Sequence, residues 1–558
     1  MALGLPTVPS LAARALSVGP RLLARAAAPG AGAVAGAAAG TARAGVTTLD
    51  TATRMTRAAR SALIGAERQW RCGARAHLAL RVADPEQARA AGGLKRLAGH
   101  VATALAEHPD VLFAYWDEGL GRLVVAAAEE AVFDGVMERA ADLAARHGLV
   151  ASGGTAEEVT HPAGRNGIRA ALAMLAADLV GTGIGVAAYA LRLPPSPRAV
   201  TAVVTVLREN PRFRALVRAR LGADAADLLL TCVNAAAHGA GQTPTALLLD
   251  GALRGCQLAD TMARSAAFEL FHDELCSPYR PSVGVADQPR PALRTTPAQE
   301  YATHAFAGSV LGAAATLLVK HDVSEAAEAV LAGSPKAARY GPTAFEAVLG
   351  ALLARSGLLV RDPERLRELE LAGTIVLHPS AVRTEDGEPD PWTEPVLDAA
   401  RRAGLRIVLV DDPALEDYTG LADQVVDARR PLDDVVCSLP EDSGAVITVA
   451  RLWSERDRGV LAGLLAGDIA LALTDDGSTV VWGADALALH GLPDVWRMLT
   501  AIPAARRVGR RSQALARSGA ALSGLLVAVG ESKSRQRGRL AAVAGRREAP
   551  GGRAPPHA

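Results

Sequence analysis

Aromatic residues are scarce in this sequence: they fill only 3% of its 558 positions, although 50% of the positions are hydrophobic. Alanine supplies most of the apolar surface, and arginine supplies nearly all of the positive charge. An excess of charge is lacking too, because the formal net charge is +1. Without a global electrostatic field, nothing in the composition would attract nucleic acid or an anionic surface, so we expect no nucleic-acid partner.

Paired cysteines are also absent. The five cysteines stand singly, and no CxxC pair occurs, which excludes a zinc ribbon and a thiol-redox motif. An odd number of widely spaced cysteines indicates reduced thiols, and therefore a cytoplasmic or membrane setting. The cysteines are Cys72, Cys232, Cys256, Cys276 and Cys437.

Long apolar runs are few. The N-terminal segment is rich in Ala, Gly and Arg but has no uninterrupted apolar core with a cleavage site, so no signal peptide is predicted. The best candidate for a membrane helix is Ala170–Leu191, which could span ~30 Å of hydrocarbon and contains one charged residue, Asp178. A central aspartate costs ~2.5–3.5 kcal/mol on insertion. A buried helical hairpin is the alternative.

The alternation of apolar and polar residues over 74–150 predicts a compact unit. ARAHLALRV alternates as a strand does, and LKRLAGHVATALAEHP has the period of an amphipathic helix. VLFAYWDEGLGRLVVAAA predicts two strands around a turn, and EEAVFDGVMERAADLAARHG predicts a second helix that ends at Gly148. This order of elements is typical of a ferredoxin-like domain.

Apolar helical segments follow, and then the pattern changes to α/β. Residues 197–220 carry several arginines with apolar residues between them and predict one interfacial or surface helix. Two helical hairpins are predicted, one from Asp227–His238 and Pro244–Leu258 and one from Tyr301–Val319 and Val323–Gly350. Turn residues at 333–335 and 341–342 should break Val323–Gly350. From Gly357 onward, strands alternate with helices, which predicts a parallel sheet with helical cover; within it the sequence DDG at 475–477 predicts a hairpin turn.

The order of these parts, and several local stretches, resemble the heavy-metal type of P-type cation-transporting ATPases. Pro335–Val360 reads PKAARYGPTAFEAVLGALLARSGLLV and aligns without a gap to the family's broken membrane helix and the chain that follows it. The stretch RDPERLRELELAGTIVL resembles the family's segment before the phosphorylation loop, and AARRAGLRIVLVDD resembles its segment before the TGD motif. SLPEDSG resembles the LPEDK motif, and AGDIALAL resembles the family's AADVGIAM. Some very large actinobacterial-type members look like a degenerate N-terminal half joined to an intact half, and this chain resembles the degenerate half.

The resemblance implies an α+β multi-domain fold, with a ferredoxin-like N-terminal domain, helical membrane hairpins and a HAD-like α/β parallel-sheet domain. The expected parts are a low-complexity lead-in (1–73), a ferredoxin-like domain without CxxC (74–150), a membrane-like helical region (165–350) with a Pro-rich linker (277–299), a degenerate HAD-like phosphorylation domain (357–500), a C-terminal apolar helix (505–530) and a disordered tail (531–558).

The residues at the family's catalytic positions depart from its pattern. His378 stands where the family has the aspartate that attacks ATP, and HPSAV replaces DKTGT. At the GDGxND position only Asp457 matches, and Trp453 takes the place of a magnesium ligand. Asp412 alone matches TGD, and Ser443 replaces the lysine of LPEDK. His378 is therefore interpreted as a remnant of the phosphoacceptor position; phosphohistidine chemistry is the alternative.

Whole parts of the family's machinery are missing as well. TGE occurs nowhere, and no room exists between Thr384 and Pro395 for a nucleotide-binding insertion. We therefore expect neither ATP nor magnesium as a cofactor of this chain, and no ATP hydrolysis by the chain alone.

The positions at which the family binds its metal are altered too. The loop after the first strand of the ferredoxin-like domain contains no cysteine, Cys72 is a lone thiol, and Ser334 and Pro335 occupy the broken-helix motif without thiolates. No metal site is therefore expected. The polar residues in apolar helices are the functional candidates by default, unless they face water or one another: Asp178, His238, Asp250, Cys256 and Asp260.

Three hypotheses follow. The first is a structural or regulatory half, or a partner, of an intact cation pump, at the cell membrane with its α/β domain in the cytoplasm and in contact with lipid. The second is a residual cation-binding or phosphatase-like enzyme that uses Asp411, Asp412 or Asp457 on magnesium. The third is a truncated gene product without an independent role, which the polar character of the chain after Gly530 would explain.

Overall fold

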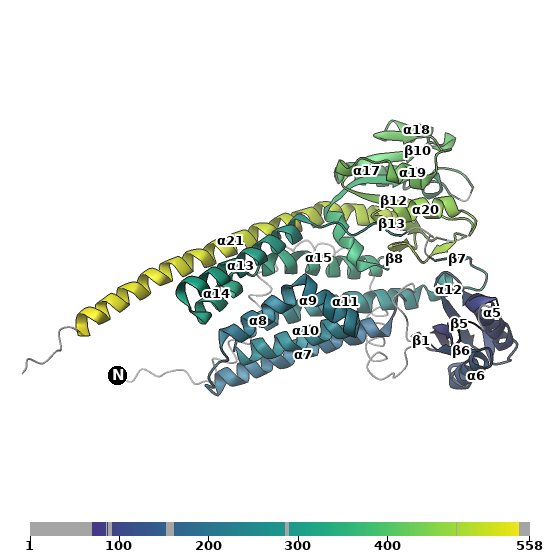
Figure 1. Ribbon diagram of the computed structural model, residues 1–558. Coiled ribbons are helices and arrows are strands. Elements are labelled where there is room, and N and C mark those ends of the chain that lie inside the picture. Colours follow the sequence, from purple (N-terminus) through teal and green to yellow (C-terminus); the bar gives the residue numbers. More distant parts are fainter. Residues whose placement is uncertain are drawn as a thin grey trace, which may run out of the picture. The chain divides into compact units, whose positions relative to one another are not determined.

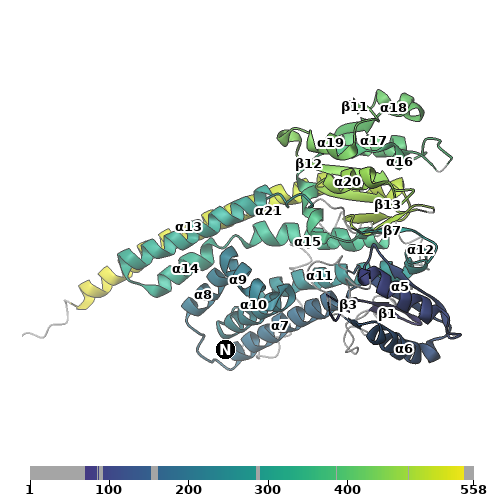
Figure 2. The same ribbon diagram turned by 45° about the vertical axis from the view of Figure 1, so that its right-hand side comes forward.

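The structure is a computed structural model that describes residues 70–545, except 85, 87–91, 152–160, 285–288, 385 and 476. Most of the predicted lead-in, much of the loop 83–93 and the end of the predicted tail therefore lie outside the described residues. Figures 1 and 2 show the chain from two directions.

The N-terminal described region is an antiparallel sheet with two helices. The sheet has the order β1-β2-β5-β4, and β3, which follows β2 after one residue, pairs with β6. Helices α5 (Gly93–Ala106) and α6 (Phe133–Arg146) pack on one face, and their apolar stripes form a core with alternate strand residues. The strands are β1 (Trp70–Cys72), β2 (Arg75–Leu78), β3 (Leu80–Val82), β4 (Val111–Asp117), β5 (Arg122–Ala127) and β6 (Leu149–Ala151).

Strand β1 lies in the segment that the sequence analysis assigned to the lead-in. Trp70 gives the reason: its side chain is buried and its ring stacks on that of His272, with centroids 5.0 Å apart. A local sequence pattern could not show this contact, because His272 lies some 200 positions further along the chain.

A helical region follows. Helices α7, α10 and α11 lie alongside one another (Figures 1 and 2). Glycines allow the close approach of α7 and α10, because a Cβ at Gly181 or Gly239 would lie 2.8 Å from a backbone oxygen of the other helix. The helices are α7 (Arg165–Ala190), α8 (Arg198–Glu209), α9 (Pro211–Leu221), α10 (Ala223–Ala240), α11 (Pro244–Leu270), α12 (His272–Leu275), α13 (Pro297–Lys320), α14 (Val323–Gly333) and α15 (Lys336–Arg355).

Two predicted helix boundaries are wrong. The single helix predicted over 197–220 is two helices, because Pro211 cannot continue α8 and the side chain of Asn210 caps α9. The chain breaks between α14 and α15 as predicted, but α15 continues through Gly341 and Pro342. Its packing against α11 and α21 outweighs the hydrogen bond that the proline removes.

Among the described residues, two helical stretches are long and apolar enough to cross a membrane: Gly167–Ala190 and Pro297–Lys320. Only 22% and 11% of their most apolar windows are buried.

The C-terminal region contains a seven-stranded sheet of order β11-β10-β9-β12-β13-β15-β8, parallel except for the pair β15–β8. Side chains alternate across it: Ile375 and Leu377 of β9 join the core formed with α17 and α21, whereas Val376 joins the core formed with α19. The strands are β8 (Leu358–Val360), β9 (Ala372–Leu377), β10 (Arg406–Val410), β11 (Gln424–Val426), β12 (Ala445–Arg451), β13 (Ile469–Leu473) and β15 (Ala486–Ala488). The α-helices within and after it are α16 (Pro379–Val382), α17 (Thr393–Arg402), α18 (Glu416–Thr419), α19 (Leu432–Cys437), α20 (Arg458–Ala466) and α21 (Leu492–Gly545), and the 3-10 turns around them are η3 (Pro363–Glu370), η4 (Pro413–Leu415) and η5 (Glu441–Ser443).

The predicted Pro-rich linker contains a short strand. β7 (Ser282–Val283) pairs in parallel with β14 (Val480–Val481), so the hairpin predicted at DDG is wrong: the strand after this turn pairs with β7 and not with β13.

The C-terminal helix is longer than predicted. α21 begins at Leu492 and continues to Gly545, beyond the expected start of a disordered tail at 531. The added residues include many Arg, Lys, Gln and Ala, which favour helix.

Candidate functional site

Three of the residues that the sequence analysis aligned with the family's catalytic positions meet at one edge of the seven-stranded sheet. His378 follows β9 directly, Asp412 follows β10, and Asp457 follows β12 and precedes α20. Because parallel strands end at the same edge, these side chains are neighbours. Burial lowers the pKa of His378 to about 4, and the nearby carboxylates of Asp457 and Asp412 oppose this shift.

His378 has a local structural role. Its Nδ1 accepts a hydrogen bond from the backbone N–H of Ser380 at 3.2 Å, which caps the short helix α16, and it lies 2.8 Å from Ser380 Oγ. Its own backbone N–H donates to the carbonyl of Val449 at 3.1 Å. An imidazole nitrogen that accepts an N–H is unprotonated, so the neutral ring fits this cap.

The carboxylates at the same edge are engaged as well. Asp412 forms an ion pair with Arg383. Asp457 Oδ2 accepts the backbone N–H groups of Trp453 at 3.3 Å and Ser454 at 3.1 Å, which closes the turn before α20. Asp411 is exposed.

An arginine that the sequence analysis did not single out fills this edge. Arg451 is the last residue of β12, and its side chain is only 3% exposed. Its guanidinium donates to the carbonyls of Ser380 and Arg383 and forms a bidentate ion pair with Asp475, with Nε–Oδ1 at 2.7 Å. Its backbone N–H donates to Ser380 Oγ at 3.0 Å. The sequence signal was a charged residue at the end of an otherwise apolar strand.

The carboxylates of Asp412 and Asp457, as they are engaged at this edge, do not suit a magnesium ion. Magnesium is bound through carboxylates together with substrate phosphates, whereas Asp412 here pairs with Arg383 and Asp457 holds backbone N–H groups. Ser443, at the LPEDK position, does not reach the site: its carbonyl accepts from Thr374 near the start of β9, at the opposite end from His378.

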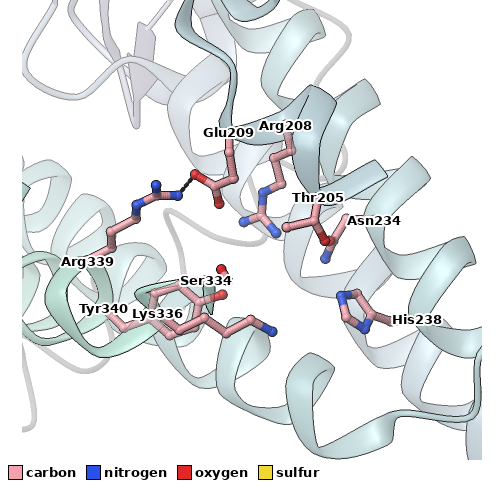
Figure 3. A pocket seen from close by; sticks show the side chains of 9 residues that line it. All are labelled: Thr205, Arg208, Glu209, Asn234, His238, Ser334, Lys336, Arg339 and Tyr340. Carbon is pink, nitrogen blue, oxygen red and sulfur yellow. Dashed lines mark ion pairs between the residues drawn. The ribbon is translucent and has the colours of Figure 1, made fainter. Parts of the chain in front are cut away.

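The second group of candidates lies among the helices, where His238 and Ser334 line a pocket (Figure 3). Asp250 is buried on α11, and its carboxylate accepts from Asn234 Nδ2 at 2.9 Å, from Arg208 at 3.2 Å and from the Tyr340 hydroxyl. A small pocket adjoins this cluster and is lined by Thr205, Arg208, Glu209, Asn234, His238, Ser334, Lys336, Arg339 and Tyr340.

The structure thus brings three predicted residues together: Asp250, His238 and Ser334. Pro335 precedes α15 directly, and its neighbours Ser334 and Lys336 line the pocket. The pocket holds Arg208, Lys336 and Arg339 but one acid, Glu209, which pairs with Arg339. This excess of positive charge disfavours a cation there. His238 Nδ1 lies 2.7 Å from Thr243 Oγ1.

Asp178 differs from the other acidic candidates. It is buried on α7, and neither of its carboxylate oxygens has a hydrogen-bond partner among the described residues. Its Cβ lies 3.9 Å from the position that a Cβ on Gly251 would take, next to Asp250. Asp260 instead pairs with Arg264 at 3.0 Å, and Cys256 is half-buried further along α11.

Comparison with curated proteins identifies relatives of one kind. The chain is 26% identical over 593 residues to "Probable cation-transporting ATPase I" of Mycobacterium tuberculosis (strain CDC 1551 / Oshkosh), a match that covers 83% of this chain and 36% of that protein. It is 25% identical over 551 residues to the protein of the same description in Mycobacterium leprae (strain TN), which covers 76% of this chain and 34% of that protein. The chain thus spans about a third of the length of the curated relatives it matches. No family model matches it.

Two similar solved structures are crystal structures of a zinc-transporting PIB-type ATPase, captured in two different states. One has a TM-score of 0.36 and 12% identity and covers 64% of this chain and 90% of that chain. The other has a TM-score of 0.32 and 12% identity and covers 48% of this chain and 63% of that chain.

Proposed function

We propose that this chain, which resembles the cation-transporting P-type ATPases, is a catalytically degenerate member that serves as a structural or regulatory half, or a partner, of an intact cation pump. In this proposal the N-terminal sheet and its helices are a ferredoxin-like domain related to the family's metal-binding domains. The seven-stranded sheet is a HAD-like phosphorylation domain that has lost its chemistry.

One observation carries this proposal: the edge of the sheet that would hold a phosphorylation site is closed by structural contacts. Arg451 holds the loop that begins at His378, through the carbonyls of Ser380 and Arg383. A nucleophilic carboxylate is replaced by a histidine that caps a helix. Restoring phosphoryl transfer would therefore require more than one substitution, because the cation clamp is missing too.

A membrane location follows from the exposed side chains of α7 and α13. On α7, Leu179 is 59% and Val180 62% exposed, and on α13 Leu318 is 75% and Val319 80% exposed. Large apolar side chains that are exposed along a helix are normally buried against another apolar surface. For helices of this length, the lipid bilayer provides that surface. The seven-stranded sheet would then lie in the cytoplasm.

The enzymatic alternative is tested with labelled ATP. The purified full-length chain in detergent is incubated with γ-labelled ATP, with and without magnesium, beside an intact P-type ATPase as the positive control. We expect no labelled protein and no phosphate release above background. Magnesium-dependent label that disappears in His378→Ala, and persists in the control Arg406→Met, would overturn the proposal.

The partner role is tested by co-expression with an intact cation-transporting ATPase from the same genome. We expect the two chains to co-purify and the intact pump's rate of ATP hydrolysis to change when this chain is present. Independent purification with an unchanged rate would favour a truncated product without a role of its own.

A second candidate function is residual cation binding, and Asp178 is the observation that favours it. An unpartnered buried carboxylate is costly unless it is protonated or meets a cation. Thermal unfolding in detergent with Na⁺, K⁺, Mg²⁺ or Ca²⁺ tests it, since a ligand at a hundred times its Kd stabilises by ~2.7 kcal/mol. Loss of such a shift in Asp178→Asn, but not in the exposed control Asp411→Asn, would support cation binding; equal shifts would exclude it at Asp178.

A further inference from the structure

Three histidines and a cysteine from distant parts of the chain meet beside the N-terminal sheet. His77 belongs to β2, His161 to the segment before α7, and His272 to α12, which Cys276 follows. We call these four residues the His–Cys cluster. None of them was a candidate in the sequence analysis, and no part of the proposed function uses them.

The cluster is compact and buried. One ligand atom from each of His77, His272 and Cys276 lies within 4.8 Å of the other two. Their exposed fractions are 2%, 1% and 0%. Two aromatic rings wall the cluster: Trp70 stacks on His272 with centroids 5.0 Å apart, and Phe268 lies edge-on to His161 at 4.9 Å.

Without a metal, the rings form a consistent chain of hydrogen bonds. The backbone N–H of Ala163 donates to His161 Nδ1 at 3.1 Å, so His161 carries its proton on Nε2 and donates to His77 Nδ1 at 3.0 Å. His77 then donates from Nε2 to His272 Nε2 at 2.9 Å, and His272 donates from Nδ1 to Asp273 Oδ1 at 3.1 Å. This series of hydrogen bonds engages every ring nitrogen of the three histidines but gives the Cys276 thiol no role.

The same geometry has the parts of a transition-metal site. Imidazole nitrogen and thiolate sulfur are the ligands that Zn²⁺ prefers. His272 has a carboxylate behind it, on the nitrogen that faces away from His77, which is the usual outer partner of a metal-bound histidine. Tetrahedral Zn²⁺ places its ligand atoms ~3.3–3.8 Å apart, so the two imidazoles would separate by a few tenths of an ångström and the thiol would move inward.

We propose that the His–Cys cluster is a metal site in which His77 Nε2, His272 Nε2 and Cys276 Sγ bind a Zn²⁺-like ion, with a water molecule as the fourth ligand. Binding removes the Cys276 thiol proton to solvent and moves the His77 proton from Nε2 to Nδ1. His77 then donates to His161, whose own proton moves to Nδ1, and the hydrogen bond from Ala163 is lost. The ion would join β2 to the end of α12, so it would act as a structural clamp.

Co²⁺ is the probe for the test, because a cysteine thiolate on tetrahedral Co²⁺ gives a charge-transfer band. The full-length protein in detergent is stripped of metal and titrated with Co²⁺, and Zn²⁺ is then added in competition. We expect a thiolate band that saturates at one equivalent and that Zn²⁺ removes. The band should vanish in Cys276→Ser and persist in the control Cys437→Ser, whose thiol is exposed on α19.

A second pair of variants keeps the test valid if Cys276→Ser does not fold. Asp273→Asn should weaken Co²⁺ affinity ~10-fold to 100-fold, whereas Arg75→Met, which breaks only the other ion pair of Asp273, should leave it unchanged. Wild-type protein that shows no thiolate band, or a band that survives in a folded Cys276→Ser variant, would overturn the proposal. Equal affinity in Asp273→Asn and Arg75→Met would also count against it.

Discussion

Replacing Arg451 with methionine tests whether one buried guanidinium holds the loop that follows His378 at the edge of the seven-stranded sheet. Methionine keeps most of the aliphatic length of arginine but removes the charged group. The substitution therefore deletes the ion pair with Asp475 and the donors to the carbonyls of Ser380 and Arg383. The backbone hydrogen bond from residue 451 to Ser380 Oγ remains.

The expected loss follows from these contacts. Asp475 is 30% exposed and can regain water, so its ion pair contributes only ~1 kcal/mol. The two carbonyls lose charge-assisted donors worth ~1.5–3 kcal/mol each, which do not add fully. The free energy of unfolding should therefore fall by ~3–5 kcal/mol, and the Tm of the sheet region by about 10 °C.

Differential scanning calorimetry in detergent measures this Tm, and limited trypsin digestion reports on the loop. Trypsin cuts after arginine, and Arg451 binds the carbonyl of Arg383, so the peptide bond after Arg383 should be cleaved faster in the variant. Arg406→Met is the matched control, because Arg406 is exposed on β10 and contacts Gln424. An Arg451→Met protein with the Tm and digestion rate of the control would refute the reasoning.

Two further predictions concern the same sheet. Burial lowers the folded-state pKa of His378 to about 4, below its ordinary ~6.5, so the stability of the protein should fall as the pH falls from about 6.5 to about 4. His378→Asn keeps a cap for the N–H of Ser380 and should remove this pH dependence. If the Tm of the wild type and of His378→Asn changed with pH in the same way, the prediction would be wrong. Gly463→Ala on α20 should lower the Tm, because the added Cβ would collide with Leu432 on α19. Gly459→Ala on α20 is the control, because a Cβ there meets nothing within 4 Å. An equal Tm for both alanine variants would exclude the clash.

The elements with a strong local pattern agree with the sequence analysis. The helix predicted from Leu94 is α5 and the helix predicted to end at Gly148 is α6, because an apolar stripe of period 3.6 has only one way to be buried. Strands β9 and β12 lie in the stretch after Gly357 where strands alternating with helices were predicted. The boundaries that failed, at Pro211 and Pro342, depend on capping and packing partners elsewhere.

The sequence by itself was enough to predict β9 from a short apolar run and to show that a histidine, His378, follows it directly. It could not show that Asp412 would pair with Arg383 or that Arg451 would close the loop. Those contacts join residues 29 to 71 positions apart, and only the parallel order of the strands brings them to one edge. The His–Cys cluster is a stronger case, since His77 and His272 are separated by 195 positions. A lone histidine on a strand has no local signal of its partners; only tertiary packing decides whether its neighbours are solvent, a hydrogen-bond chain or metal ligands.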